Sequence, residues 1–232
     1  MIYDKEIEQF VDFVNWTKND PSIWVVYPAG CIGDLVSSII NFHYASTGAK
    51  YLGISNSGQV IFRSSDGKKF NKTDYSINDS IEDLVNESLS ENQLNYSKID
   101  QIIFSNHSWH SSKIKDILKW SLSAKIIRIL PKNKQELNII NWLASFKNFN
   151  ILNEFNNTAN LDLFQIDSID DPRFLEIYFS DILSKNTFDQ TYNKIIDHLG
   201  LEYKLIRYDF IEYYISRQHQ NITPALLEIA NN

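Results

Sequence analysis

The sequence is poor in the residues that mark secreted and membrane proteins. Its 232 residues include a single cysteine, Cys31, so no disulfide can form within the chain and a reducing, cytoplasmic location is expected. No apolar run approaches the roughly 18 residues that span a bilayer, so the sequence predicts no transmembrane helix. The first residues lack a basic stretch followed by an apolar one, so no secretory signal is expected.

Positive charge is also scarce. Lysine and arginine total 22 against 29 acidic residues, a formal net charge of −7, which argues against a general nucleic-acid binder. Basic residues nevertheless gather between residues 113 and 134, where seven of them accompany a single acid, Asp116. A basic segment inside an acidic protein indicates a small polyanionic ligand rather than a long polyanion.

Apolar residues are abundant, at 43% with 13% aromatic, so one α/β domain with a packed core is expected over residues 1–232. The chain has only seven glycines, yet Gly30 and Gly33 fall close together after an apolar strand at 23–27. The helix predicted to follow runs from Leu35 to about Ser46. Such a turn directs N–H groups of the helix start toward an anion. It is also common in α/β proteins generally, so this pattern alone leaves both interpretations open.

The rest of the chain alternates between strand and helix patterns. This alternation predicts a three-layer α/β fold with a central, mainly parallel sheet flanked by helices and a ligand site at the carboxyl edge of the sheet. We expect a loop with one short helix over the site at 150–172. The further predicted elements are helices at 4–18 and 81–89, a hairpin or irregular lobe at 51–75, strands at 100–104, 125–130 and 174–179, and helices starting at Ser111 or Ser112 and spanning 134–149, 188–199 and 206–219.

Polar residues follow the strand at 100–104 and include two histidines. His107 is a candidate general base, with His110 in reserve, because imidazole exchanges protons near neutral pH. A strand-end histidine bonded to a backbone carbonyl is the alternative. The pair lacks a carboxylate or thiol partner at ligand spacing, so no metal is predicted. Cys31 is expected to be a small turn residue rather than a nucleophile.

Three stretches together resemble the P-loop sulfotransferases. Residues 27–33 (YPAGCIG) are similar to the loop that holds the phosphosulfate in that family. Residues 124–134 (AKIIRILPKNK) resemble the strand and turn before its 3′-phosphate-binding helix. Residues 177–183 with 195–201 resemble its late strand, turn and helix end. The resemblance implies a P-loop-like fold.

The resemblance also implies an activity, namely transfer of a sulfuryl group from 3′-phosphoadenosine 5′-phosphosulfate to a hydroxyl or amine of a small-molecule or carbohydrate acceptor. It implies that His107 takes the acceptor's proton. Ala29 stands where the family has a lysine, so Lys132 or Lys134 would supply that charge. The donor contacts that it implies come from Ala29, Gly30, Cys31, Ile32, Gly33, Asp34 and Leu35 around the turn, and from Arg128, Lys132, Lys134 and Asn138.

Two other interpretations stay open. The segment 30–36 is also similar to the glycine-rich turn of some nucleotide-sugar glycosyltransferases. Alternatively, the chain is a sulfotransferase-like domain without donor chemistry that serves as a binding module, with its aromatic C-terminal region as an interface. No nucleic-acid or membrane partner is expected, and the sequence predicts neither the acceptor nor the oligomeric state.

Overall fold

The structure is a computed structural model. It describes residues 22–44, 50–54, 60–63, 69–73, 101–107, 109–145, 168–201, 203, 208–216 and 223–231. The helices predicted at 4–18 and 81–89, and most of the loop predicted at 150–172, lie outside these residues. Within the described parts, no helix combines the length and hydropathy needed to cross a membrane.

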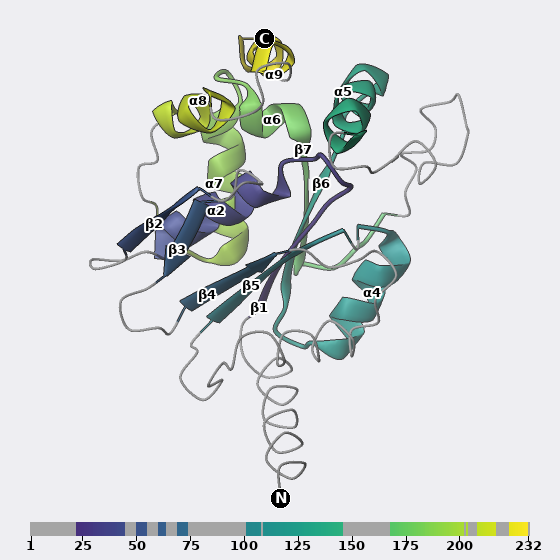
Figure 1. The fold of residues 1–232 in the computed structure, drawn as a ribbon. Coiled ribbons are helices and arrows are strands. Elements are labelled where there is room, and N and C mark those ends of the chain that lie inside the picture. Colours follow the sequence, from purple (N-terminus) through teal and green to yellow (C-terminus); the bar gives the residue numbers. More distant parts are fainter. Residues whose placement is uncertain are drawn as a thin grey trace, which may run out of the picture.

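Five strands form one sheet in the order β4-β5-β1-β6-β7 (Figure 1). They are β1 (Ser22–Val26), β4 (Lys69–Thr73), β5 (Gln101–Asn106), β6 (Lys125–Leu130) and β7 (Phe174–Tyr178). Every neighbouring pair is parallel. The central strand β1 is buried from Ile23 to Val26, as its continuous apolar run predicts. The predicted α/β character with a parallel sheet is therefore confirmed.

The lobe predicted at 51–75 was only partly correct. Strands β2 (Lys50–Ile54) and β3 (Val60–Arg63) do pair antiparallel as a small second sheet. Strand β4, however, pairs with β5 at the edge of the main sheet. Its sequence, KFNKT, is largely polar and carries two lysines, which is common for an edge strand but hides it from a search for apolar runs.

Helices cover both faces of the sheet, with α2 and α7 on one side and α4 on the other (Figure 1). The strand predicted to end at 179 ends at Tyr178, and Phe179 begins a short helix that was not predicted. Neither Ser111 nor Ser112 caps α4, because His110 occupies that position. The helix predicted at 206–219 is the shorter α8, and α9 was not predicted. The helices are α2 (Gly33–Tyr44), α4 (Ser111–Trp120), α5 (Lys134–Ser145), α6 (Phe179–Leu183), α7 (Phe188–Leu199), α8 (Asp209–Ser216) and α9 (Thr223–Asn231).

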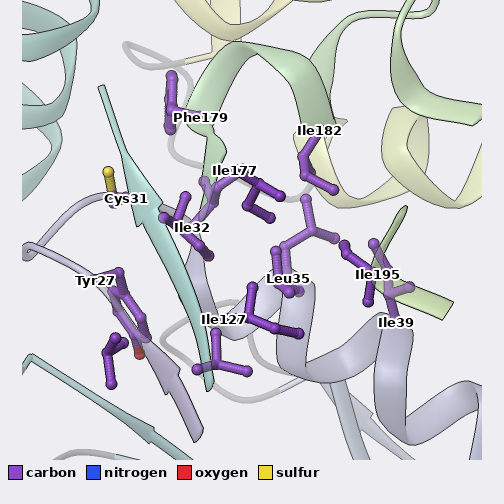
Figure 2. Close-up of a cluster of buried hydrophobic side chains, with 14 of the residues drawn as sticks. Tyr27, Cys31, Ile32, Leu35, Ile39, Ile127, Ile177, Phe179, Ile182 and Ile195 are labelled. Atoms are coloured by element: carbon purple, nitrogen blue, oxygen red, sulfur yellow. The ribbon is translucent and has the colours of Figure 1, made fainter. Parts of the chain in front are cut away.

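The core lies on both faces of the sheet. On one face Trp24 of β1 meets Trp120 of α4 edge to face, with ring centroids 6.4 Å apart. On the other face the strands pack against α2 and α7 through fully buried aliphatic side chains, each contributing about 1.5–3 kcal/mol by its removal from water. Figure 2 shows this second cluster, which includes Leu35, Ile39, Ile127, Ile177 and Ile195.

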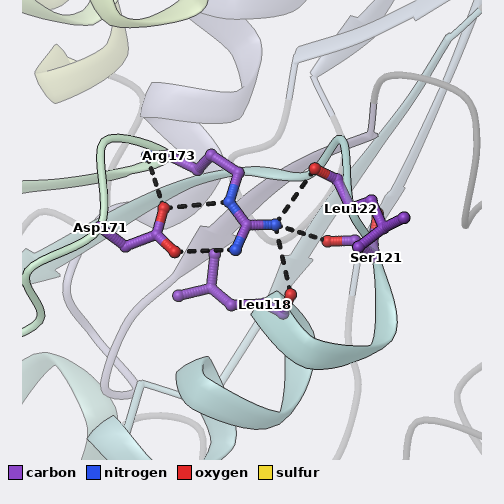
Figure 3. A network of polar contacts seen from close by, with 5 residues as sticks. All are labelled: Leu118, Ser121, Leu122, Asp171 and Arg173. Carbon is purple, nitrogen blue, oxygen red and sulfur yellow. Dashed lines mark hydrogen bonds and ion pairs between the residues drawn. The ribbon is translucent and has the colours of Figure 1, made fainter.

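A polar network at the amino edge of the sheet joins β7 to α4 (Figure 3). Arg173 Nη1 donates to the carbonyls of Leu118, Ser121 and Leu122 at 3.2, 2.8 and 3.2 Å. The last carbonyls of a helix lack intrahelical donors, and the guanidinium supplies them. Asp171 accepts from Arg173 Nε and Nη2, and these bonds hold the pKa of the Asp171 carboxyl below its usual value. The network fixes the start of β7 against the end of α4.

Candidate functional site

The connections after β1, β5 and β6 lie at one edge of the sheet, because all three strands are parallel. The chain leaves β1 toward β4 on one side, whereas it leaves β5 toward β6 on the other side of β1. Ligands of open parallel sheets bind where successive connections leave in opposite directions. The topology therefore points to the carboxyl end of β1, where the turn of Gly30 and Gly33 lies.

The turn after β1 is held against α5. The amide of Cys31 donates to the carbonyl of Pro28 at 3.0 Å, and Gly30 has a φ of +86°, in the region that favours glycine. A Cβ at Gly30 would lie 2.5 Å from the backbone oxygen of Ile140 in α5. Glycine is therefore required at position 30 for two separate reasons, the backbone conformation and the close approach of a helix.

Ile32 carries backbone strain. Its φ of +49° is rare for a β-branched residue and costs about 1–3 kcal/mol. Two features hold it there. Its carbonyl accepts from the amides of Leu35 and Val36 at 2.9 and 3.3 Å, which starts α2. Its side chain is buried and points toward the aliphatic cluster shown in Figure 2.

Tyr27 lies against the start of α2. A Cβ at Gly33 would come within 1.8 Å of the Tyr27 ring, so only glycine allows the ring to occupy this place. The ring is buried, and its edge meets the ring of His107 with centroids 5.0 Å apart and an interplanar angle of 74°. The aromatic ring thus connects the first residue of α2 to the histidine at the end of β5.

His107 is half-buried, and its Nδ1 lies 3.1 Å from the carbonyl oxygen of Tyr27. A carbonyl oxygen can only accept, so Nδ1 carries the proton in this contact. In the neutral imidazole Nε2 is then the proton-accepting nitrogen. The backbone bond expected as the alternative to catalysis is therefore present, and it selects the tautomer that a general base needs.

His110 lies one turn further along the chain. Its ring stacks on that of the buried Trp109, with centroids 4.0 Å apart and planes 26° apart. Burial lowers the pKa of His110 below its usual value, and the positive charge of Arg128 lowers it further. Both effects favour the neutral imidazole, and His110 occupies the N-cap position of α4.

Arg128 is buried within an ion pair on the face covered by α4. Its Nε donates to Glu176 Oε2 at 2.9 Å, Nη2 donates to the same oxygen, and Nη1 donates to Ser111 Oγ at 3.1 Å. The guanidinium also lies 4.9 Å from the centre of the Phe174 ring. Only 2% of the Arg128 side chain is exposed, so it does not share a surface with the exposed candidates Lys132, Lys134 and Asn138.

The turn after β6 holds the remaining basic candidates. Lys132 is exposed, with Nζ 3.4 Å from Asp181 Oδ1 and 5.9 Å from the centre of the Tyr178 ring. Lys134 and Asn138 are exposed on the first turns of α5. At the same turn the backbone N–H of Lys132 donates to the buried Glu136 at 2.7 Å, and the N–H of Glu136 donates to Asn133 at 2.9 Å.

Cys31 is fully buried in the turn after β1. Burial raises the pKa of its thiol well above the usual value, and the charge of Glu136 raises it further. The nucleophilic form is the thiolate, which is therefore strongly disfavoured here. This agrees with the expectation that Cys31 is a small turn residue. Ala29, beside it, is also buried.

Three polar residues at this edge were not predicted to take part in these contacts. They are Glu136, Glu176 and Ser111, the last through its hydrogen bond to Arg128. The sequence does contain a pattern for the two glutamates. Glu176 is the one charge in the strand FLEIY, and Arg128 is the inner charge of the neighbouring strand KIIRIL, directly opposite it. The spacing of Asn133 and Glu136 matches a capping box.

Within the part of the chain that the structure describes, no three histidine, cysteine or acidic side chains gather as they would around a metal ion. A comparison with protein-family models finds no match to the chain, and a comparison with curated proteins finds none either. The candidate site is therefore described by two features at the ends of the neighbouring strands β1 and β5. The first is the strained turn that contains Gly30 and Ile32, and the second is His107 with its Nδ1 bonded to the Tyr27 carbonyl.

Proposed function

We propose that this chain is a sulfotransferase-like enzyme that transfers a sulfuryl group from 3′-phosphoadenosine 5′-phosphosulfate to a hydroxyl or amine of a small-molecule or carbohydrate acceptor. The observation that carries the proposal is the bond from His107 Nδ1 to the Tyr27 carbonyl at 3.1 Å. It supports a proton-accepting Nε2 beside the turn between β1 and α2. The central position of β1, followed directly by this glycine turn, is compatible with the P-loop arrangement that the sequence resembles.

The start of α2 offers main-chain donors for the phosphosulfate. The first N–H groups of a helix lack intrahelical acceptors and favour anions. The amides of Leu35 and Val36 are bonded to Ile32, so we assign the amides of Gly33 and Asp34 to the donor. Tyr27, packed against Gly33, forms part of the floor beneath them.

Side-chain charge for the donor comes from the turn after β6. Lys132 is exposed and held by Asp181, and it takes the role of the lysine that Ala29 replaces. Lys134 and Asn138, exposed on α5, are assigned to the 3′-phosphate. Arg128 is left out of this assignment, because its guanidinium is committed to Glu176 and Ser111.

The proposed chemical step is an in-line displacement. The acceptor oxygen or nitrogen attacks sulfur, its bond to sulfur forms, and the bond from sulfur to the bridging phosphate oxygen breaks. His107 Nε2 takes the acceptor's proton, an effect typically worth 10²–10⁴-fold in rate. Adenosine 3′,5′-bisphosphate leaves with the electron pair of the broken bond, stabilised by the helix amides and Lys132.

The test is transfer of radiolabelled sulfate from the donor to a panel of phenols, sugars and amines. We expect His107→Ala to lower kcat by at least about 100-fold, the lower limit for a lost general base, while binding of adenosine 3′,5′-bisphosphate is retained. The matched control is His110→Ala, which removes the neighbouring imidazole. Turnover that is unchanged in His107→Ala would exclude His107 from the role, and loss only in His110→Ala would assign the base to His110.

A second candidate function, a binding module without donor chemistry, is favoured by one observation. The buried carboxylate of Glu136 in α5 raises the pKa of the Cys31 thiol, so its negative charge acts on the turn proposed to hold an anion. Absence of turnover together with absence of thermal protection by adenosine 3′,5′-bisphosphate would support this candidate. Protection by a nucleotide sugar instead would favour the glycosyltransferase interpretation.

A further inference from the structure

The segment that carries His107 is anchored to the sheet through Arg128. Register pairs Arg128 of β6 with Glu176 of β7, and the carboxylate receives both Nε and Nη2 of the guanidinium. The third nitrogen, Nη1, reaches Ser111 Oγ at 3.1 Å, in the first residue of α4. A planar guanidinium can hold a carboxylate on one edge and a hydroxyl on another, which a lysine ammonium does with much less directional control.

Two backbone hydrogen bonds lie between His107 and the first turn of α4. The amide of Trp109 donates to the carbonyl of His107 at 2.9 Å. The amide of Ile114 in α4 donates to the carbonyl of His110 at 3.0 Å. Trp109 is buried beneath the His110 ring. These contacts give a displacement of Ser111 a path to the His107 ring.

We propose that Arg128, oriented by Glu176, is a positioning residue that holds the His107 imidazole at the Tyr27 carbonyl through Ser111. The inference rests on the proposed function, since it gives the ion pair a part in general-base catalysis. The proposed effect does not depend on the substrate. The bond between Arg128 and Ser111 keeps His107 Nδ1 at the Tyr27 carbonyl and so keeps the proton on Nδ1.

The test variant is Ser111→Ala, which leaves the ion pair of Arg128 and Glu176 in place and removes the hydroxyl that Arg128 Nη1 reaches on α4. The matched control is Ser112→Ala, the exposed neighbour on the same helix. Nitrogen-15 NMR of the imidazoles reports the tautomer directly. We expect His107 to show one protonated Nδ1 in the unmodified protein and in Ser112→Ala, and a mixture of tautomers in Ser111→Ala. For sulfuryl transfer we expect kcat to fall about tenfold or more in Ser111→Ala with an unchanged KM for the donor, since small misplacements of reacting groups are costly.

A second variant, Arg128→Lys, keeps the positive charge but lacks the planar guanidinium that contacts Glu176 and Ser111 together. We expect it to show the same mixture of His107 tautomers as Ser111→Ala. If Arg128→Lys does not fold, Ser111→Ala still decides the question. A single Nδ1 tautomer together with an unchanged kcat in Ser111→Ala would overturn the inference. If the unmodified protein transfers no sulfuryl group at all, the proposed function fails, and the NMR comparison alone then decides whether Arg128 positions His107.

Discussion

Gly30→Ala tests whether the turn after β1 is held against α5. Gly30 has a φ of +86°, and an added Cβ would lie 2.5 Å from the Ile140 oxygen and 3.2 Å from the Ala144 nitrogen. Both atoms belong to the backbone of a helix, so they cannot rotate away. Gly200 provides a matched control, because its φ is +69° but nothing lies within 4 Å of an added Cβ.

The two substitutions share their conformational cost and differ in their contacts. A left-handed backbone costs a non-glycine residue about 1–2 kcal/mol, and the stiffer unfolded chain returns roughly 0.4–1 kcal/mol. Gly200→Ala should therefore lower the free energy of unfolding by about 0–1.6 kcal/mol. Gly30→Ala carries the same terms plus the overpacking of α5, which typically adds about 1–3 kcal/mol.

The assay is urea unfolding of both variants and the unmodified protein, followed by circular dichroism. For a chain of this size each kcal/mol lowers Tm by roughly 2–4 °C, so thermal unfolding gives an independent measure. We expect Gly30→Ala to be the less stable variant by about 1–3 kcal/mol, with an unchanged urea slope. Equal stabilities for the two variants would refute the close approach of the turn to α5.

Three further predictions concern the edges of the sheet. Arg173→Ala should lower the free energy of unfolding by about 1.5–3 kcal/mol, because three carbonyls lose a charged donor; urea unfolding measures this, and a loss below about 0.5 kcal/mol would contradict it. Burial, and then the charge of Lys125, lower the pKa of His198 in the folded state. The unfolded chain therefore binds a proton at His198 more readily, with a pKa near 6.5. The stability that His198 contributes is present above that pKa and is lost as the pH falls toward the folded-state pKa. His198→Gln should therefore make unfolding less pH-dependent below about pH 6.5, and an unchanged slope would exclude His198 as a source. Lys132→Ala should weaken binding of adenosine 3′,5′-bisphosphate about tenfold by calorimetry while Tm stays constant, because its ion pair with Asp181 is exposed; unaltered affinity would remove Lys132 from the site.

The sequence predicted the central elements of the fold because burial leaves a plain pattern. Strand β1 is apolar from Ile23 onward since both of its faces are covered, and the helix after it begins at the second glycine of a pair. Strand β4 escaped prediction because an edge strand needs no apolar run, and α6 because it has only five residues. These misses have a common origin, in that short or edge elements are specified by their neighbours in space.

The candidate site was predicted at the level of which loops meet, and not at the level of contacts. His107 reaches the Tyr27 carbonyl because register pairs Val26 with Asn106, which places the next residue of each strand side by side. The pairing of Arg128 with Glu176 likewise depends on β6 and β7 being neighbours. Sequence spacing contains neither fact, so Arg128 was assigned to a ligand rather than to an ion pair.

The most direct test of the proposed function is calorimetric titration of the protein with adenosine 3′,5′-bisphosphate, the product common to every sulfuryl transfer from this donor. The proposed function predicts saturable binding at one site per chain, with a Tm that rises as ligand is added in excess of Kd. Absence of both heat and thermal protection at millimolar ligand would contradict it.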